Sequence, residues 1–540
     1  MSKKILLFFL VIFYCLNVSY AQETNKYWVY VDEPILSSLG INKLSTPALS
    51  KRSLDRRLRQ NIPLRSFDYS MPNSLADMVE STGANVRFFS RWLRAFSVEA
   101  SEFQYHQLSM KKWIKEIVPV RRMVRRKLQE EGVIYGFSYG QSLDQTTQIN
   151  LSPVHDLGYA GQGILIGLMD GGFSGVESHS VFQGAWNQGR IVLTKDFVDG
   201  DTNVFHVGSH GMSVLSTICA DINGTFVGTA PEASFALFRT ENELSETIAE
   251  EDNWVWASEW ADSIGVDITN TSLGYTTFDN GIGDHTYSDL DGRTSVISLA
   301  ANISARVGII VVAAAGNEGA SSWKYISCPA DADSILSVGA VDSQGIRSAF
   351  SSQGPTSDGR IKPDLMARGS GATVMTSNGT IGTSSGTSFA SPIICGATAS
   401  LLQLAKSVSL NYDIQALMNM IRNSSSNAFN PDSLYGYGIP NYGSIIAHIG
   451  INEDNIQDPF NLTYSENGWL VSWTRPMNIQ KIEILGYSGR ILFEKRYHSE
   501  DNINFRHHNN GINGTSLGAK TTVNTLKHIN IKPFSSTFIS

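Results

Sequence analysis

Residues 163–172 read Gly-Ile-Leu-Ile-Gly-Leu-Met-Asp-Gly-Gly, an apolar run of strand length that ends abruptly at one acidic residue and two glycines. Similar apolar runs recur along the chain at 235–238, 266–269, 308–313 and 335–341, with helix-like amphipathic stretches such as 213–222 and 296–307 between several of them. Continuous apolar strands that alternate with helices are typical of a parallel sheet covered on both faces. We therefore expect an α/β fold with a mostly parallel central sheet over about residues 150–448. A ligand site is expected at the carboxyl ends of its strands.

Two smaller pieces flank this central part. Residues 22–130 combine strand-like stretches with a charged helical run at 50–61, which predicts an α+β unit. The Arg/Lys-dense segment 120–127 closes that unit and is typical of an exposed linker. After residue 450, short alternating strands predict a small β-sandwich; they lie at 469–473, 481–485 and 491–493. The expected domains are therefore 22–130, 131–450 and 451–540.

The first 21 residues are expected to be a signal peptide. Lys3 and Lys4 precede an apolar run over 5–16, and Ser19-Tyr20-Ala21 offers a small-residue cleavage pattern. A retained anchor helix is the alternative. No later stretch reaches ~18 consecutive apolar residues, so no stable membrane span is expected. The sequence therefore predicts a protein that is secreted or displayed at the cell surface.

Composition and charge limit the class of protein to which the chain can belong. The chain of 540 residues is 42% hydrophobic and 17% charged, which is typical of a globular protein with several domains. Its net charge is −8, but residues 22–130 contain 19 Lys/Arg against 11 Asp/Glu, whereas residues 131–450 contain 12 against 31. These opposite signs favour two bodies that attract each other, although a solvated basic face explains the same counts. The acidic balance gives no support to nucleic-acid binding.

No cofactor or metal site is predicted. Cys219, Cys328 and Cys395 are too few and too widely spaced for a disulfide framework or a metal site, and we expect them to be small buried residues. Six acids between 241 and 252 are expected to form a solvated helix start. The alternatives are an acidic cleft wall for basic substrates or a calcium site, but no regular calcium-loop spacing is present.

Three residues are candidates for a catalytic role. Asp170 ends the apolar run quoted above, His210 lies in Gly-Ser-His-Gly before an apolar stripe of helical spacing, and Ser388 lies where a glycine-rich loop becomes a helix. Each has an ordinary structural explanation: a strand-capping acid, a histidine at a helix start and a capping serine. Thr387 is expected to cap the helix that follows. His206 lies in a loop-like stretch and ranks well below His210.

Their combination favours nucleophilic catalysis. A serine hydroxyl needs a base to remove its proton, and histidine is the usual base. A histidine at a helix N-terminus needs a carboxylate partner, because the helix dipole there disfavours the imidazolium. Asp170 is the candidate partner. A dinucleotide site is excluded, because the glycines around Asp170 lack the fingerprint that follows a strand and opens a helix.

These motifs resemble those of the subtilisin-like serine peptidases over roughly residues 150–448. Asp, His and Ser follow in that family's order, 40 and 178 residues apart, and residues 386–392, Gly-Thr-Ser-Phe-Ala-Ser-Pro, match its serine motif. The resemblance implies that Asp170, His210 and Ser388 form a catalytic triad. It also implies that Asn317, at the end of Val-Val-Ala-Ala-Ala-Gly-Asn, donates a hydrogen bond to the oxyanion. Two further segments ahead of the serine motif also match the family: Gly354-Pro355 and residues 362–364.

The resemblance further implies how substrate and inhibitor are held. Six residues are expected to line the site for a polypeptide substrate: Ser272, Leu273 and Gly274 on one side, and Ala314, Ala315 and Gly316 on the other. Residues 22–130 match the family's propeptide in place and size, so the chain is expected to bind its own propeptide, with a maturation cut between about 120 and 145. The C-terminal piece weakly resembles sorting domains of secreted Bacteroidetes proteins.

One departure from the family pattern bears on activity. Met212 and Ser213 follow His210-Gly211, where the family usually has Thr and often His. We expect altered local packing there, and a secreted serine endopeptidase made as a proenzyme remains the favoured interpretation. The alternatives are a non-catalytic binding protein on the same scaffold, which an inert serine would reveal, and an esterase, which would prefer small esters over peptides.

Overall fold

The computed structural model describes residues 25–120, 138–242, 245, 247–279, 283–408 and 412–449, together with five strands between 460 and 533. Residues 1–449 form one compact unit and residues 450–540 form a second. The predicted signal peptide (1–21), the basic residues 121–127 and most of the predicted maturation region lie outside the described residues.

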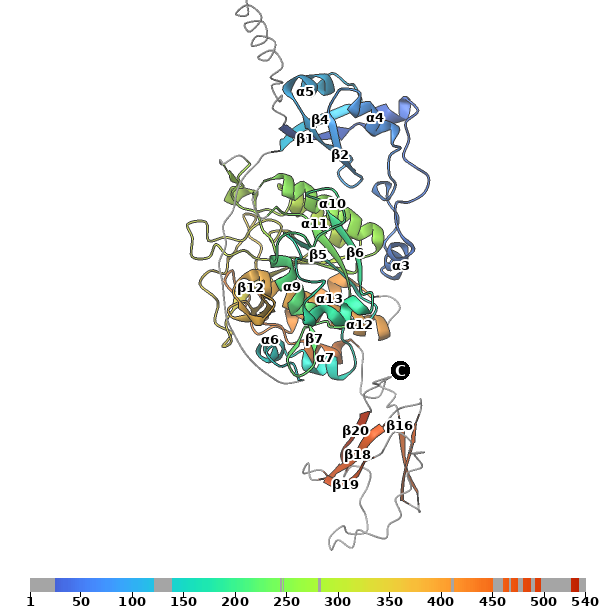
Figure 1. The fold of residues 1–540 in the computed structure, drawn as a ribbon, viewed down its shortest axis with the longest axis vertical. Helices are drawn as coiled ribbons and strands as arrows, with labels where there is room; N and C mark the ends of the chain where they lie inside the picture. The colour runs from blue at the N-terminus through green and yellow to red at the C-terminus, as the bar shows by residue number, and fades with distance from the viewer. Residues whose placement is uncertain are drawn as a thin grey trace, which may run out of the picture. The chain divides into compact units, whose positions relative to one another are not determined.

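A seven-stranded sheet forms the centre of the first unit (Figure 1). Its order is β13-β12-β11-β10-β5-β9-β6, and every neighbouring pair is parallel. The predicted α/β class with a parallel central sheet is confirmed. The strands are β5 (Leu165–Asp170), β6 (Ile191–Asp196), β9 (Ser234–Arg239), β10 (Ile268–Thr271), β11 (Ile310–Ala314), β12 (Leu336–Val341) and β13 (Leu365–Arg368).

The two edge strands, β6 and β13, are the ones that the sequence pattern missed. Most residues of β6 are partly exposed, so it lacks the continuous apolar run that marks a strand covered on both faces. β13 has only four residues. The five inner strands match the five predicted apolar runs, and no strand end differs from its predicted position by more than two residues.

Helices cover both faces of this sheet (Figure 1). α10 (Ala249–Ile264) and α11 (Val296–Arg306) share a core with Leu165 and Met169 of β5. α9 (His210–Cys219) and α12 (Thr387–Val408) pack together, and α12 lies across β10 to β13. In the described part of the chain, α12 alone is long and apolar enough to cross a membrane. Because 94% of its apolar window is buried inside the protein, it is a core helix.

Short elements complete the unit and support the loops around the sheet. The helices are α6 (Leu143–Gln148), α7 (Ser152–Asp156), α8 (Gln183–Asn187), α13 (Ile414–Asn423) and α14 (Tyr442–Ile445). The strands β7 (Asp221–Ile222) and β8 (Phe226–Val227) form one antiparallel pair, and β14 (Ala372–Met375) and β15 (Ile381–Ser384) form another.

The N-terminal part of this unit is an α+β domain, as predicted. Its antiparallel sheet has the order β2-β3-β1-β4, and one face of it buries a separate apolar core. The strands are β1 (Asn25–Val31), β2 (Asn85–Ser90), β3 (Ala95–Ala100) and β4 (Ile114–Val120), and the helices are α2 (Glu33–Ser38), α3 (Lys51–Arg59), α4 (Ser74–Glu80) and α5 (Glu102–Ser109).

The N-terminal sheet packs against α10. Trp28 and Phe88 join the core that α10 shares with the central sheet, and the Phe88 ring stacks on Trp256 with centroids 4.4 Å apart. Burying aromatic rings in this way stabilises the contact between the two domains without requiring charge.

The prediction of a solvated acidic run is wrong for the acids that the structure describes; Glu243 and Glu246 lie outside the described residues. Glu250, Glu251 and Asp252 are only 2%, 0% and 1% exposed, and Asp252 faces the N-terminal sheet, where Ser97 donates to it. Each finds a polar partner: Glu250 accepts from the backbone of Thr247, Glu251 pairs with His285 at 2.6 Å, and Asp252 pairs with Arg87 at 3.1 Å. Buried charges need such partners, which is why these acids do not face water.

The second unit contains five described strands. β16 (Phe460–Ser465) pairs with β17 (Gly468–Trp473), and β18 (Ile479–Gly486) lies between β19 (Ile491–Arg496) and β20 (Leu526–Pro533), all antiparallel. The three predicted strands lie within β17, β18 and β19. The sandwich packing and the sorting role stay predictions.

We expect Gly396→Ala in α12 to destabilise the protein, although alanine favours helices by about 1 kcal/mol. A Cβ at this position would stand 2.1 Å from Thr229 Oγ1 and 3.0 Å from Ile218 Cγ2, and such overpacking costs about 1–3 kcal/mol. Denaturant unfolding checks the effect. Adding Thr229→Ala removes the closest atom and should recover part of the loss; a gain in stability for Gly396→Ala alone would contradict this account of the packing.

Candidate active site

The candidate site lies at the carboxyl edge of the central sheet. Parallel register places Met169 of β5 opposite Thr271 of β10, and Thr271 opposite Ala313 of β11. The residues that follow these three positions therefore emerge at the same edge. The chain also runs from β5 to β6 and β9 on one side and then crosses to β10 on the other, which makes this edge a switch point where such sheets bind ligands.

Asp170 and His210 are joined at this edge. Asp170 ends β5 and is fully buried, and His210 begins α9, as its sequence pattern predicted. A hydrogen bond of 2.7 Å connects His210 Nδ1 with Asp170 Oδ1, which also accepts from the backbone N–H of Gly171 at 2.8 Å. The His210 side chain is 32% exposed. The buried acid thus fixes the orientation of a ring that solvent can reach.

Close approach of α9 to β5 depends on Gly211. A Cβ there would stand 2.6 Å from the carbonyl oxygen of Gly172 and 2.8 Å from Asp170 Cβ, so only glycine allows this spacing. The next two residues, where the sequence departs from the family pattern, both pack inward. Met212 is fully buried, and Ser213 Oγ donates to the Met375 carbonyl at 2.7 Å. The departure from the family pattern therefore affects how α9 packs inside the protein.

Ser388 is the second residue of α12 and is 9% exposed. Its hydroxyl donates to the carbonyl oxygen of Ser272 at 3.2 Å, and the Ser272 hydroxyl donates to the carbonyl oxygen of Ser388 at 2.8 Å. The ring of the neighbouring Phe389 lies 5.8 Å from the His210 ring, centroid to centroid. α12 thereby brings Ser388 to the edge that carries Asp170 and His210.

Asn317 is held by the start of the same helix. Its Oδ1 accepts from the backbone N–H of Thr387 at 2.9 Å and from the Thr387 hydroxyl at 3.1 Å. The expected capping role of Thr387 is therefore wrong: α12 begins at Thr387, and Asn317 supplies the cap from another loop. Because Oδ1 is committed to the helix, the Nδ2 amide is the group that Asn317 can offer to a ligand; it stands 3.8 Å from where a Cβ on Gly386 would lie.

Of the six residues predicted to line a substrate, three directly follow β10, Ala314 ends β11, and the other two come just after it. Leu273, Ala314 and Ala315 are buried, and the two glycines leave no room for side chains. A Cβ on Gly274 would stand 2.0 Å from Ser327 Oγ, and one on Gly316 would stand 3.0 Å from the same atom. Ser327 therefore lies between the two segments. No sequence motif marked it, because only the fold brings residue 327 beside both glycines.

One group of three side chains in the described residues could hold a metal ion: Asp196, Asp199 and His206. Arg239 Nη1 already pairs with Asp196 at 2.7 Å and with Asp199 at 2.6 Å. A guanidinium there neutralises the charge that a cation would need, so we assign no metal to this group. His206, which ranked below His210 in the sequence, is thus separate from Asp170.

The three cysteines of the described residues are buried and unreactive. Cys219, Cys328 and Cys395 are free and fully buried, as predicted. Burial raises the pKa of the Cys219 thiol to about 12 and the pKa values of Cys328 and Cys395 well above the usual range. A thiolate is the reactive form of cysteine, and none of the three forms it near neutral pH.

The chain matches two models of known families over most of its first 450 residues. A model described as the subtilase family matches residues 161–438, which include Asp170, His210, Asn317 and Ser388. A second model, described as the peptidase S8 propeptide domain of Bacteroidota, matches residues 26–132.

Several subtilisins match about half of the chain. Subtilisin E of Bacillus subtilis is 32% identical over 269 residues, which are 49% of this chain and 62% of that protein. Subtilisin of Bacillus pumilus is 32% identical over 47% of this chain and 82% of its own length, and subtilisin DY of Bacillus licheniformis is 31% identical over 54% and 92%. The chain thus spans less than two thirds of subtilisin E but most of the other two.

The cap on α12 can be tested through stability. Asn317→Ala should lower the free energy of unfolding by about 1 kcal/mol, because the N–H of Thr387 loses its acceptor. Asn317→Asp keeps an oxygen there, and a negative charge is favoured near a helix N-terminus, so its loss should be smaller. Denaturant unfolding of both variants in a Ser388→Ala background compares them. Equal losses would contradict the assigned cap.

Proposed function

The chain belongs to the subtilase family, and from this we propose that it is an exported serine endopeptidase made as a latent precursor. The observation that carries the proposal is the 2.7 Å hydrogen bond between His210 Nδ1 and Asp170 Oδ1, at the sheet edge where α12 begins with Ser388. A carboxylate, an imidazole and a serine hydroxyl gathered at one edge are the parts that acyl transfer needs.

The reaction begins with attack by Ser388. His210 Nε2 takes the hydroxyl proton while Ser388 Oγ forms a bond to the carbonyl carbon of the peptide. Asp170 keeps the proton of the imidazole on Nδ1, so that Nε2 is free to accept the proton of the serine. Asp170 also stabilises the imidazolium that forms, and because Asp170 is buried, its charge acts at low dielectric.

Two donors stabilise the oxyanion of the tetrahedral intermediate. We assign them to Asn317 Nδ2 and the backbone N–H of Ser388. One such donor is worth about 3–4 kcal/mol of the barrier, a magnitude measured in subtilisin itself. The intermediate collapses when His210 gives its proton to the leaving amine. Water, activated by the same histidine, then hydrolyses the acyl-enzyme and frees Ser388.

Polypeptides are the proposed substrates. The backbone of Ser272, Leu273 and Gly274 can pair with an extended peptide as an added strand, with 314–316 on the other side of the first pocket. Pairing is assigned to residues 272–274, because the backbone of Ala315 and Gly316 is already hydrogen-bonded to other parts of the protein.

The precursor form follows from the first 130 residues. We assign residues 1–21 to a signal peptide, 22–130 to a propeptide, 131–450 to the catalytic domain and 451–540 to a C-terminal β-sandwich. The propeptide model that matches residues 26–132 supports the second assignment. The propeptide would block the site until it is cut between about 120 and 145 and released.

Replacing the nucleophile tests the proposal. Ser388→Ala should lower kcat on casein by about 10⁶-fold, and Asp170→Asn by about 10⁴-fold, as equivalent changes do in enzymes of this mechanism. Ser385→Ala, an exposed serine on the same loop, should leave the rate unchanged. A fluorophosphonate should label the wild type on Ser388 only.

Three outcomes would count against the proposal. Casein cleavage at the original rate by Ser388→Ala would refute the assigned nucleophile. A wild type that neither cleaves nor takes up the fluorophosphonate would favour a non-catalytic binding protein. Rapid hydrolysis of small esters without cleavage of peptides would favour an esterase.

The pH dependence of propeptide retention tests the latent form. Burial under the N-terminal domain raises the pKa of Asp252 to about 6, against the attraction of Arg87 and a hydrogen bond from Ser97, whereas an exposed aspartate titrates near 3.9. The complex therefore binds this proton more tightly than the separated domains do. Through this group, acid should favour the complex, and binding should weaken by roughly 30-fold as pH rises from 4 to 6.

The measurement is the fraction of excised propeptide that co-elutes with the processed enzyme across this range. Asp252→Asn should reduce the slope of the profile, while Asp55→Asn, a surface acid on α3, should leave it unchanged. Burial also raises the pKa of Glu259, which acts in the same direction, whereas the arginines lower the pKa of Asp262, which acts in the opposite direction. A wild-type profile without slope between pH 4 and 7 would contradict the mechanism.

A further inference from the structure

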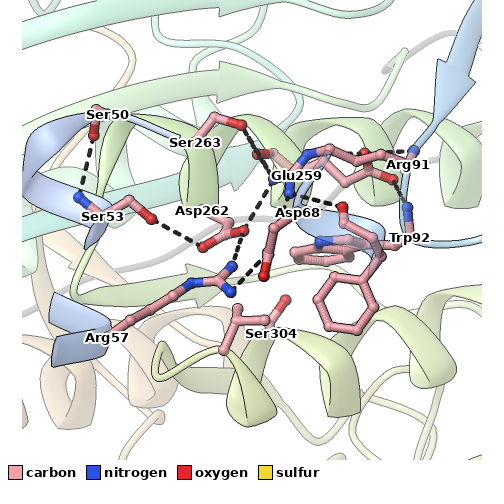
Figure 2. A network of polar contacts seen from close by, with 12 residues as sticks. Ser50, Ser53, Arg57, Asp68, Arg91, Trp92, Glu259, Asp262, Ser263 and Ser304 are labelled. Carbon is pink, nitrogen blue, oxygen red and sulfur yellow. Dashed lines mark hydrogen bonds and ion pairs between the residues drawn. The ribbon is translucent and has the colours of Figure 1, made fainter. Parts of the chain in front are cut away.

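Helix α3 makes a second, ionic contact between the N-terminal domain and α10, apart from the contact of the sheet. Arg56 and Arg57 of α3 are each 1% exposed, and both reach Asp262 of α10, which is fully buried. Arg57 Nη2 lies 2.7 Å from Asp262 Oδ2 (Figure 2). Arg56 Nη2 donates to Asp262 Oδ1. Arg91, from the turn between β2 and β3, adds a third guanidinium at 2.9 Å from Oδ2.

The same arginines bind backbone carbonyls of the catalytic domain. Arg56 Nη1 donates to Val266 at 2.6 Å, and Arg91 Nη2 donates to Glu259 at 3.0 Å. These carbonyls lie in and just after α10. The guanidiniums therefore fit one fixed arrangement of the helix end, and a lysine could not make this set of contacts.

The charges balance only when the two domains are together. Asp68 of the N-terminal domain pairs with Arg57 at 2.6 Å, and the Glu259 carboxylate accepts from the backbone N–H groups of Arg91 and Trp92 (Figure 2). Three buried arginines thus meet three buried acids. Burial raises the pKa of Asp262, but the three arginines outweigh burial and hold it below its usual range.

This arrangement discriminates between partners in a way that the apolar contact does not. Any sheet with suitable aromatic side chains could pack on Trp256. A domain without the arginines would, however, bury Asp262 with no partner, and an unpaired buried charge is strongly destabilising. After release, Asp262 regains water. A repulsive cost for the wrong partner is one of the two routes to specificity.

We propose that Asp262 is the residue by which the catalytic domain selects its own propeptide, and that Arg56, Arg57 and Arg91 are the side chains it recognises. The proposal rests on the proposed role of residues 22–130 as the propeptide. It adds that latency depends on α3 and the β2–β3 turn as well as on the sheet that packs against α10.

Variants on the propeptide side test this without changing the mature enzyme. In the full-length chain, Arg56→Ala and Arg57→Ala should each speed release of the excised propeptide by about 100-fold and shorten the lag before casein is cleaved. Arg59→Ala is the matched control, because Arg59 lies on the same helix and is exposed. Release rates for Arg57→Ala equal to those of wild type would overturn the proposal.

A double-mutant cycle then separates recognition from general loss of packing. If Asp262 is what Arg57 recognises, Arg57→Ala should change release at least 10-fold less in an Asp262→Ala background than in the wild type, because only Asp68 is then left to pair with Arg57. Additive effects of the two substitutions would overturn the assigned pair.

An uncleaved precursor keeps the test decisive if a variant yields no processed enzyme. In full-length Ser388→Ala, adding Asp262→Asn should raise hydrogen exchange in α3 at least 10-fold while β1 and β3 stay protected. Unchanged protection of α3 would overturn the proposal. This readout needs no catalysis, so a failure of the proposed peptidase activity would show separately, as missing fluorophosphonate labelling of the wild type.

Discussion

The parallel register of β5, β10 and β11 is the constraint on which the candidate site depends. It makes three strands end together, so that Asp170, Ser272 and Ala314 share one edge although they are far apart in the sequence. A slip of one residue in β5 would turn every side chain of that strand to the opposite face and remove Asp170 from His210. The starts of α9 and α12 then bring His210 and Ser388 to the same edge of the sheet.

Much of this could be predicted from the sequence, because the signals are local. The inner strands are continuous apolar runs, and the start of α9 is marked by an apolar stripe after His210. The motifs around Asp170, His210 and Ser388 carry the family resemblance, which the match over residues 161–438 confirms. The edge strand β6 was missed because its partly exposed residues lack that signal.

The features that sequence reasoning could not reach are those made by contacts between distant segments. The acids at the start of α10 were predicted to be solvated because nothing local shows that His285 and the N-terminal sheet contact them. Opposite net charges predicted attraction between the two domains, but not that Arg57 would be buried against Asp262. The cap on Thr387 likewise comes from Asn317, 70 residues earlier in the chain.

The three buried, unpaired cysteines bear on the redox conditions under which the protein can fold. The described part of the chain holds no cystine cross-link, so its covalent framework is the same under reducing and oxidising conditions. Folding of that part needs no disulfide isomerase and proceeds alike on either side of a membrane that separates the two environments. The stability of that part then comes from packing, hydrogen bonds and ion pairs, without covalent cross-links.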